Sequence, residues 1–244
     1  MTALVDAGRR VLPRGYADFA RQLAIWFGFY ILYQLARGAA DRDAAAAFDN
    51  GLKVIDVERR FGDLWELSLQ GFLGSSHLLI ELTSWTYWLS QFAVLGLALL
   101  WVYLRRNEHF LRFRDTVLVA NLIGLVGYVL LPTAPPRMFP DFGFVDTLAR
   151  FSSVNHSSAA IEFASNPYAA MPSLHAADAL IVGVVMAGIV RWRPAKVLWL
   201  AWPAWVAFAV MATGNHFWLD IAAGAVVAGA AALVVRRYRR VQRA

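Results

Sequence analysis

The sequence predicts an all-α integral membrane protein, a bundle of six transmembrane helices that forms a single membrane domain over residues 1–244. Hydrophobic residues make up 59% of the 244 residues and charged residues only 16%, whereas a soluble domain has about 45–50% and about 25%. The mean hydropathy is +0.49. The apolar residues are also gathered into six segments with basic residues between them. These three observations exclude a disordered chain, a coiled coil and an ordinary water-soluble enzyme.

The six predicted spans cover residues 22–40, 86–104, 115–132, 174–190, 197–213 and 217–235. A helix needs about 20 residues to cross roughly 30 Å of hydrocarbon. The shorter spans therefore require a thinner bilayer or aromatic anchors at their ends. Helices are predicted because an isolated strand cannot satisfy its backbone hydrogen bonds in lipid.

The positions of lysine and arginine set the predicted orientation. Most of the 23 basic residues precede the first span, follow the sixth, or lie between spans two and three or four and five. Because cytoplasmic links carry excess positive charge, we expect a multi-pass protein of the cytoplasmic (inner) membrane. Residues 1–21 would be a cytoplasmic N-terminus, 22–235 the core and 236–244 a basic cytoplasmic tail. The net charge of +6 then reflects topology and anionic lipid, and nucleic-acid binding is not expected.

Two long connections face outward in this topology. The first, residues 41–85, places Phe48, Leu52, Ile55 and Phe61 near one stripe of a helix, which predicts short amphipathic helices in the outer interface between spans one and two. The second, residues 133–173, is rich in Pro, Ser and Asn and is expected to be an ordered loop.

Polar residues at membrane depth are few, and they converge on the outer boundary. Arg137 follows the end of span three, and Ser173 and His175 open span four. His216 and Asp220 lie where spans five and six join. The predicted topology therefore brings all five side chains to one depth, which favours a functional site there.

Each of these residues suits a phosphate ester. Ser173 is a candidate N-cap before an apolar run, and the free amides of the first helical turn bind anions. Arg137 offers a charged fork for phosphate oxygens. Asp220 lies four residues after His216 and can hold one imidazole nitrogen, which leaves the other as nucleophile or base. His175 is suited to protonate a leaving alkoxide. Together they form a phosphoryl-transfer set.

Each residue also has a simpler, purely structural interpretation. Either histidine alone could hydrogen-bond between helices, Arg137 could contact a lipid headgroup, and Ser173 could be only a cap. Asp220 is harder to explain without function, because an acid within a span is expensive.

Asp178 lies one turn from His175 and could keep that imidazole protonated as an acid. A polar contact between helices explains it equally well. Asn215 is a second possible modulator because it precedes His216. His77, His109 and His156 are expected to be ordinary surface or interface residues. The chain has no cysteine and no spacing typical of a closed metal site, so no metal or cofactor is expected.

At these residues the chain resembles the type 2 phosphatidic acid phosphatase superfamily, and more closely its branch that contains inositol phosphorylceramide synthases. Three blocks carry the resemblance: Pro-Thr-Ala-Pro-Pro-Arg ending at Arg137, Pro-Ser-Leu-His ending at His175, and His-Phe-Trp-Leu-Asp from His216 to Asp220. The segment from Ile55 to Glu66 also looks like the outer amphipathic region of that branch. The resemblance covers roughly residues 48–235.

The resemblance implies that His216 is a nucleophile that forms a phosphohistidine, that Asp220 orients it and that His175 is the general acid. Arg137, Ser173 and the amides near Leu174 would hold the phosphate, without a metal. The sequence departs from the broader family at Leu130 and Val210, where the family has a lysine and an arginine. Fewer cations remain there, which weakly favours a phosphodiester or lipid phosphate over a highly charged substrate.

The sequence therefore predicts a membrane lipid phosphate phosphatase with an active site that faces outward. The expected substrates are phosphatidic acid, phosphatidylglycerol phosphate or a polyprenyl (di)phosphate. A phosphotransferase that passes the phospho-headgroup to a lipid or sugar hydroxyl is the first alternative. A lipid transporter is the second; the polar residues lie at one boundary rather than the midplane, and no inverted repeat is visible, which both count against it.

Overall fold

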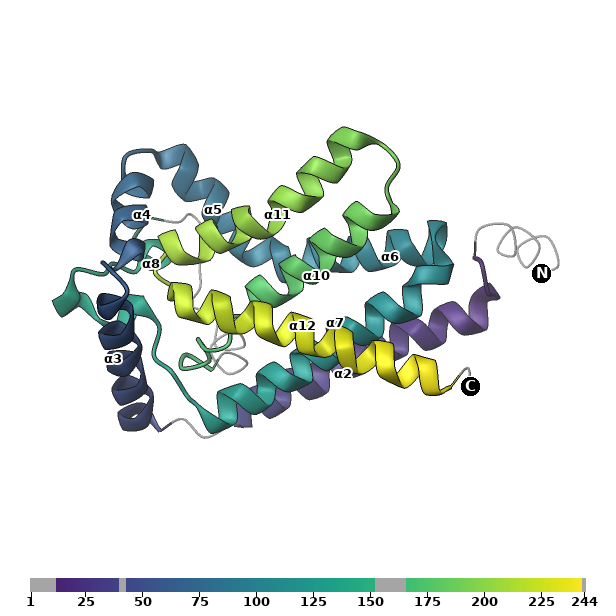
Figure 1. The fold of residues 1–244 in the computed structure, drawn as a ribbon, viewed down its shortest axis with the longest axis horizontal. Helices are drawn as coiled ribbons and strands as arrows, with labels where there is room; N and C mark the ends of the chain where they lie inside the picture. The colour runs from purple at the N-terminus through teal and green to yellow at the C-terminus, as the bar shows by residue number, and fades with distance from the viewer. Residues whose placement is uncertain (1–11, 40–42, 152–165, 243–244) are drawn as a thin grey trace.

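The computed structural model describes residues 12–39, 43–151 and 166–242, and every regular element within them is a helix. The single β-type pairing within these three ranges is an isolated bridge between Thr133 and Ala169. The all-α prediction is therefore confirmed for the part of the chain that the structure describes (Figure 1).

The long helices are α2 (Gly15–Ala39), α7 (Asn107–Leu130), α10 (Leu174–Ile189), α11 (Arg193–Ala212) and α12 (Trp218–Val241). Between α2 and α7 come α3 (Ala44–Arg60), α4 (Trp65–Gly74), α5 (His77–Leu89), a π-helical turn η1 (Ser90–Val94) and α6 (Leu95–Arg105). The connection from α7 to α10 holds two 3-10 turns, η2 (Pro136–Met138) and η3 (Pro140–Phe142), and the short α8 (Thr147–Phe151).

The bundle is built around α10 and α12. Helix α12 packs against α7 and α10, α11 pairs with α10 and α5, and α2 lies along α7. Helices α3 and α4 lie across one end of the bundle, whereas α2 begins and α12 ends at the opposite end (Figure 1). The beginning of α2 and the end of α12 therefore lie at the same end of the bundle (Figure 1), and their location on the cytoplasmic side of a membrane stays a prediction.

Among the described residues, four runs of helix are long and apolar enough to cross a membrane: His77–Arg105, Asn107–Leu130, Arg193–Ala212 and Trp218–Val241. Helix α10 is apolar but has only 16 residues. Helix α2 has 25 residues but is not among the four. The structure thus supports a multi-pass membrane protein with four candidate spans, and the count of six stays a prediction for α2 and α10.

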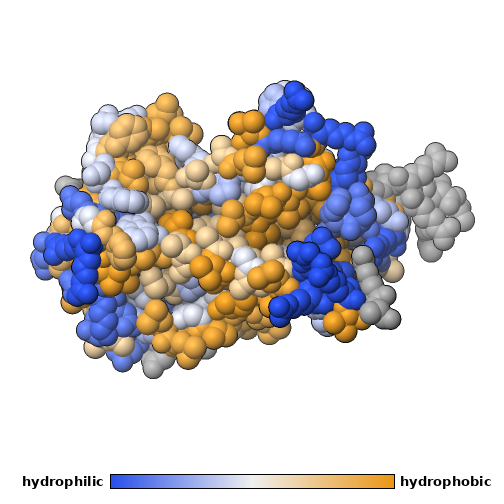
Figure 2. All heavy atoms as spheres, in the orientation of Figure 1, coloured by the Kyte–Doolittle hydropathy of each residue, from blue (hydrophilic) through white to orange (hydrophobic). Residues whose placement is uncertain are grey.

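An apolar surface surrounds the middle of the bundle. Leu32, Leu97, Leu130 and Val226 are exposed, Leu130 to 76%. Figure 2 shows apolar residues across the central part of this face and hydrophilic residues concentrated at its two ends. Such a broad apolar surface is unfavourable in water and suits contact with lipid chains.

Helices extend beyond several predicted spans. The second span was predicted at 86–104, but α5, η1 and α6 form one run from His77. Helix α12 continues to Val241, six residues past the predicted end of the sixth span at 235, so the first part of the predicted basic tail 236–244 is helical; its cytoplasmic location stays a prediction. Ion pairs explain the extension, because Asp115 of α7 binds Arg239 of α12 and its own neighbour Arg114. Hydropathy falls where charges begin, while the hydrogen-bonded helix continues.

The outer connection forms helices α3 and α4, but the predicted apolar stripe of α3 is wrong in part. Ile55 is buried together with Gly51 and Glu58, whereas Phe48 and Phe61 are exposed. Phe139 explains the register, because its ring occupies the space over Gly51, where a Cβ would lie 2.5 Å from the ring. Helix α3 therefore turns a glycine and an acid toward the protein.

Candidate functional site

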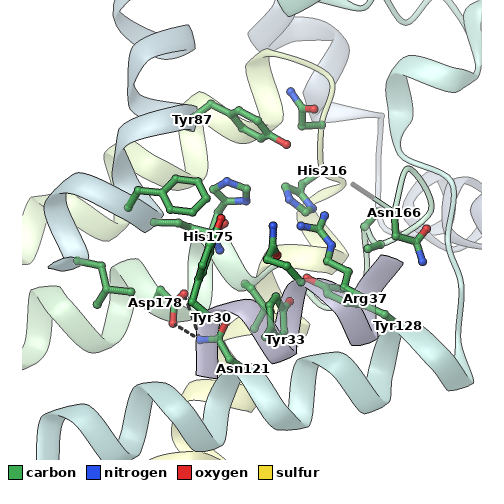
Figure 3. A pocket seen from close by; sticks show the side chains of 18 of the residues that line it. Tyr30, Tyr33, Arg37, Tyr87, Asn121, Tyr128, Asn166, His175, Asp178 and His216 are labelled. Atoms are coloured by element: carbon green, nitrogen blue, oxygen red, sulfur yellow. Dashed lines mark hydrogen bonds between the residues drawn. The ribbon is translucent and has the colours of Figure 1, made fainter. Parts of the chain in front are cut away.

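A pocket opens where the start of α10, the turn before α12 and the middle of the bundle meet (Figure 3). Its lining includes His175, His216, Arg137, Asn215 and Asp178 among the predicted residues, together with Leu174. Its volume is about 90 Å³, which suits a phosphate-sized group rather than a whole phospholipid. Acyl chains of a lipid substrate would have to lie outside it.

A tight turn between α11 and α12 fixes His216. The amides of Asn215 and His216 both donate to the carbonyl of Val210, at 3.0 and 3.1 Å. Gly214 has φ +73°, and a Cβ there would lie 2.8 Å from the carbonyl oxygen of Val145. Only glycine combines that backbone angle with so close a neighbour, so this residue allows the turn that points His216 into the pocket.

His216 and Asp220 form the predicted pair. Nδ1 of His216 lies 3.3 Å from Oδ2 of Asp220, and the same oxygen accepts a 2.9 Å hydrogen bond from the amide of Phe217. Burial, reinforced by the Arg137 guanidinium, lowers the pKa of His216 to about 3. The imidazole is therefore neutral at ordinary pH. With the Nδ1 hydrogen donated to Asp220, Nε2 keeps the lone pair that a nucleophile needs.

His175 lies in the first turn of α10 and faces His216 across the pocket. The two rings have centroids 5.6 Å apart and are inclined at 61°. Tyr87 of α5 stacks on the other side of His175, with centroids 4.5 Å apart, and sequence reasoning did not identify this tyrosine. Two imidazoles therefore flank one small space, in which a reacting group can contact both.

Ser173 caps α10 as the sequence predicts, because its Oγ accepts a 3.3 Å hydrogen bond from the amide of Ala176. Its own amide donates to the carbonyl of Asp220 at 3.0 Å. This second bond ties the start of α10 to the first turn of α12. The hydroxyl and the two histidines therefore keep a fixed relation to one another.

Arg137 enters the site from η2. Its amide donates to Gly214 at 2.8 Å, its Nη1 donates to Oδ1 of Asn215 at 2.6 Å, and its Nε lies 3.6 Å from Asp146. Asn215 in turn donates from Nδ2 to the hydroxyl of Thr213 at 2.9 Å. Asn215 therefore orients the guanidinium, which gives it a structural place in the site.

The other predicted polar residues lie apart from the two histidines. Asp178 accepts a 3.1 Å hydrogen bond from Nδ2 of Asn121 on α7, which is the polar contact between helices considered above, and no described hydrogen bond joins it to His175. His77 and His109 are exposed, while His156 lies outside the described residues. Within 12–39, 43–151 and 166–242 there is no cluster of three or more His, Asp or Glu side chains that could hold a metal ion.

Two buried glutamates were missed by sequence reasoning. Oε1 of Glu58 accepts from the amide of Leu219 at 3.0 Å, and Oε1 of Glu66 accepts from the amide of Trp218 at 2.6 Å. Both side chains are fully buried. Burial, followed by the nearby Glu66 carboxylate, raises the pKa of Glu58 to about 8, and burial also raises that of Glu66.

Three carboxylates, from Asp220, Glu66 and Glu58, thus bind the consecutive amides 217, 218 and 219. These are the orphan donors at the start of α12, where negative charge is also favoured by the helix dipole. The only signal in the sequence was that Glu58 lies one turn after Ile55, on the apolar side of α3.

Comparison with known proteins finds one family and one named relative. A family model described as the PAP2 superfamily matches residues 52–234. A protein of Bacteroides thetaiotaomicron named phosphoinositol dihydroceramide synthase is 35% identical over 102 residues. The matched segment is 36% of this chain and 33% of that protein, so the chain corresponds to about a third of the relative's length. No solved structure matches.

Proposed function

This chain belongs to the PAP2 superfamily, and from that premise we propose that it cleaves a lipid phosphate ester through a phosphohistidine on His216. Membership and the named relative support a phosphoryl-transfer enzyme of the membrane in general. The observation that carries the finer proposal is the 3.3 Å pair of His216 and Asp220 facing His175 across a phosphate-sized pocket.

In the first half-reaction, Arg137, the Ser173 hydroxyl and the amides at the start of α10 hold the phosphate. Nε2 of His216 attacks phosphorus, a P–N bond forms and the P–O bond to the leaving group breaks. His175, as an imidazolium that has taken a proton from water, gives that proton to the leaving oxygen, so a phosphomonoester lipid departs as a neutral alcohol and a diphosphate lipid departs as its monophosphate. The carboxylate of Asp220 stabilises the positive charge on the phosphorylated imidazole, as in other acid–histidine pairs.

In the second half-reaction, a water molecule transfers a proton to His175 as its oxygen attacks phosphorus. The P–N bond breaks, inorganic phosphate leaves and His216 returns to its neutral form. The product is a dephosphorylated lipid. Every step uses side chains of this chain, so turnover is expected in the presence of EDTA.

A phosphotransferase is the second candidate. The relative's name describes a synthase, and the pocket continues past the histidines to Gln34, Gln91 and Asn121. These uncharged hydrogen-bonding side chains suit hydroxyl groups. In that reaction a lipid or sugar hydroxyl would replace water in the second half-reaction, and the chemistry on His216 would be unchanged.

We further propose that the pocket faces outward across the cytoplasmic membrane. Arg239 and Asp115 lie near the C-terminal end of α12, at the opposite end of that helix from His216. The basic residues that follow on α12 would then lie on the cytoplasmic side, where positive charge accumulates.

The test is turnover of phosphatidic acid, phosphatidylglycerol phosphate and a polyprenyl diphosphate by purified protein in detergent with EDTA. Free phosphate and lipid products would be followed by mass for wild type and His216→Ala, with His77→Ala as a control histidine that is exposed. We expect phosphate release in wild type and His77→Ala only. Turnover that needs an added hydroxyl lipid and releases no phosphate would favour the transferase. Equal turnover in His216→Ala would refute both mechanisms.

A further inference from the structure

Helix α2 contributes one face to the pocket that holds the two histidines. Tyr30, Tyr33, Gln34 and Arg37 all line that pocket, and their spacing of three, four and seven residues places them on one side of a helix. This helix lies outside the matched segment 52–234. The family match therefore says nothing about what α2 does in the site.

Among the described residues, no acidic side chain pairs with Arg37 in that pocket. Its Nε is buried and has no hydrogen-bond partner. Its guanidinium lies over the ring of Tyr128, whose centroid is 5.9 Å from Cζ. The carboxylate that shares the pocket, Asp178, is bound instead by Asn121.

The guanidinium lies close enough to the proposed nucleophile to act on it. In Figure 3 the side chain of Arg37 extends from α2 toward the space beside His216 and His175. Its charge is one of the causes that lower the pKa of His216. An unpaired charge in such a place destabilises the empty protein, and an arginine retained within a membrane bundle is typically functional. The missing partner is therefore expected to be an anion that enters the pocket.

We propose that Arg37 is a second phosphate-binding residue, which holds the anionic oxygens of the substrate from α2 while Arg137 holds them from η2. The inference rests on the proposed function for the identity of the substrate, but not for the binding of phosphate. Two arginines in one small pocket favour a phosphate with two negative charges, as in a phosphomonoester or a diphosphate, over a singly charged diester.

The proposal is tested by binding of inorganic phosphate, which needs no turnover. The variants Arg37→Gln and Arg37→Lys would be made in the His216→Ala background. The matched control is Arg21→Gln, which removes the same charge from the same helix at an exposed position. Phosphate affinity would be read from the rise of Tm with phosphate concentration at constant ionic strength. Loss of a charge-assisted contact should weaken binding about 10- to 100-fold in Arg37→Gln.

The variant Arg37→Lys keeps the charge but not the planar guanidinium, so its phosphate affinity should fall between that of the His216→Ala parent and that of Arg37→Gln. Arg37→Gln should also be at least as stable as its parent without phosphate, because an unpaired cation is removed. A purely structural arginine, held by Tyr128, would give the reverse: a lower Tm without phosphate and unchanged phosphate affinity. That result overturns the proposal, as does equal weakening in Arg21→Gln. If Arg37→Gln does not fold, a phosphate affinity of Arg37→Lys equal to that of its parent overturns the proposal.

Turnover by otherwise wild-type protein separates this inference from the proposed function. With a phosphomonoester lipid, Arg37→Gln should raise KM about 10-fold or more, and the effect should be smaller with a diester. Phosphate binding that depends on Arg37 in a protein without turnover would refute the proposed function alone. Turnover that depends on His216 but is indifferent to Arg37 would refute this inference alone.

Discussion

Gly224 is the place where α12 crosses the start of α10, and replacing it by alanine tests the packing that positions the site. A Cβ at this position would lie 2.3 Å from the carbonyl oxygen of Ser173 and 3.4 Å from the Cβ of Ala176. The oxygen cannot move alone, because the amide of Ser173 is bound to Asp220 at 3.0 Å. The two helices must therefore separate, at a cost of about 1–3 kcal/mol for such overpacking.

Gly229 provides the control on the same helix. A Cβ there meets no atom within 4 Å, so Gly229→Ala should gain the ordinary helix preference of about 0.5–1 kcal/mol. Thermal unfolding in detergent, followed by tryptophan fluorescence, would compare the two variants with wild type. We expect Tm to fall in Gly224→Ala and to rise slightly in Gly229→Ala, with turnover lost only in the former. Equal Tm and equal turnover in both variants would show that this packing does not control the site.

Three further perturbations address other parts of the structure. Burial raises the pKa of Glu58 to about 8 from an ordinary 4.5, so the folded state binds this proton more tightly than the unfolded state does. The resulting stabilisation is fully present below pH 4.5 and is lost as the pH rises through about 8. Glu58→Gln should therefore flatten the decline of Tm between these two pH values. Asp220→Asn removes the charge that stabilises the phosphorylated imidazole and should lower kcat about 10²- to 10⁴-fold at similar KM. Stopped-assay kinetics would measure both constants, and a kcat equal to that of wild type would contradict the role assigned to Asp220. Asp115→Asn breaks the ion pair with Arg239, which lies far from the pocket. It should lower the free energy of unfolding by at most about 1 kcal/mol and leave KM unchanged. A changed KM would instead show that this ion pair is coupled to the site.

Helix boundaries were predictable where capping and hydropathy agree. The fourth span, predicted at 174–190, is observed as Leu174–Ile189, because Ser173 marks its start. The second span was predicted nine residues too short at its beginning. The hydroxyls of Thr83 and Ser84 lower the hydropathy there, but they donate to the carbonyls of Leu79 and Ile80 within the helix. Their polarity is satisfied locally, which a hydropathy sum does not see.

The candidate site was predictable where its contacts are local or fixed by topology. His216 and Asp220 are four residues apart, so helical spacing alone brings them together. The hydrogen bond of Arg137 to Asn215 joins residues 78 positions apart, and the shared membrane depth predicted only that they would lie near each other. No local pattern could bring Arg37 into the pocket, because a lone arginine near the end of a span reads as an interfacial anchor.

The two departures from the family pattern have a structural explanation. Leu130 is 76% exposed on the surface of α7, and Val210 is buried in an apolar cluster with Val206 and Ala179. Neither position lines the pocket. A basic residue at either would have to leave its present surroundings to reach the phosphate, so their loss does not by itself indicate an inactive site.

The contacts of Glu58 and Glu66 with α12 end on main-chain amides, not on side chains. Any residue except proline supplies such an amide, so positions 218 and 219 can change freely without breaking either bond. Evolution can therefore hold these two acids constant while their partners drift. Methods that infer contacts from correlated substitutions would miss this junction, and a redesign of this bundle that keeps only co-varying pairs would discard it.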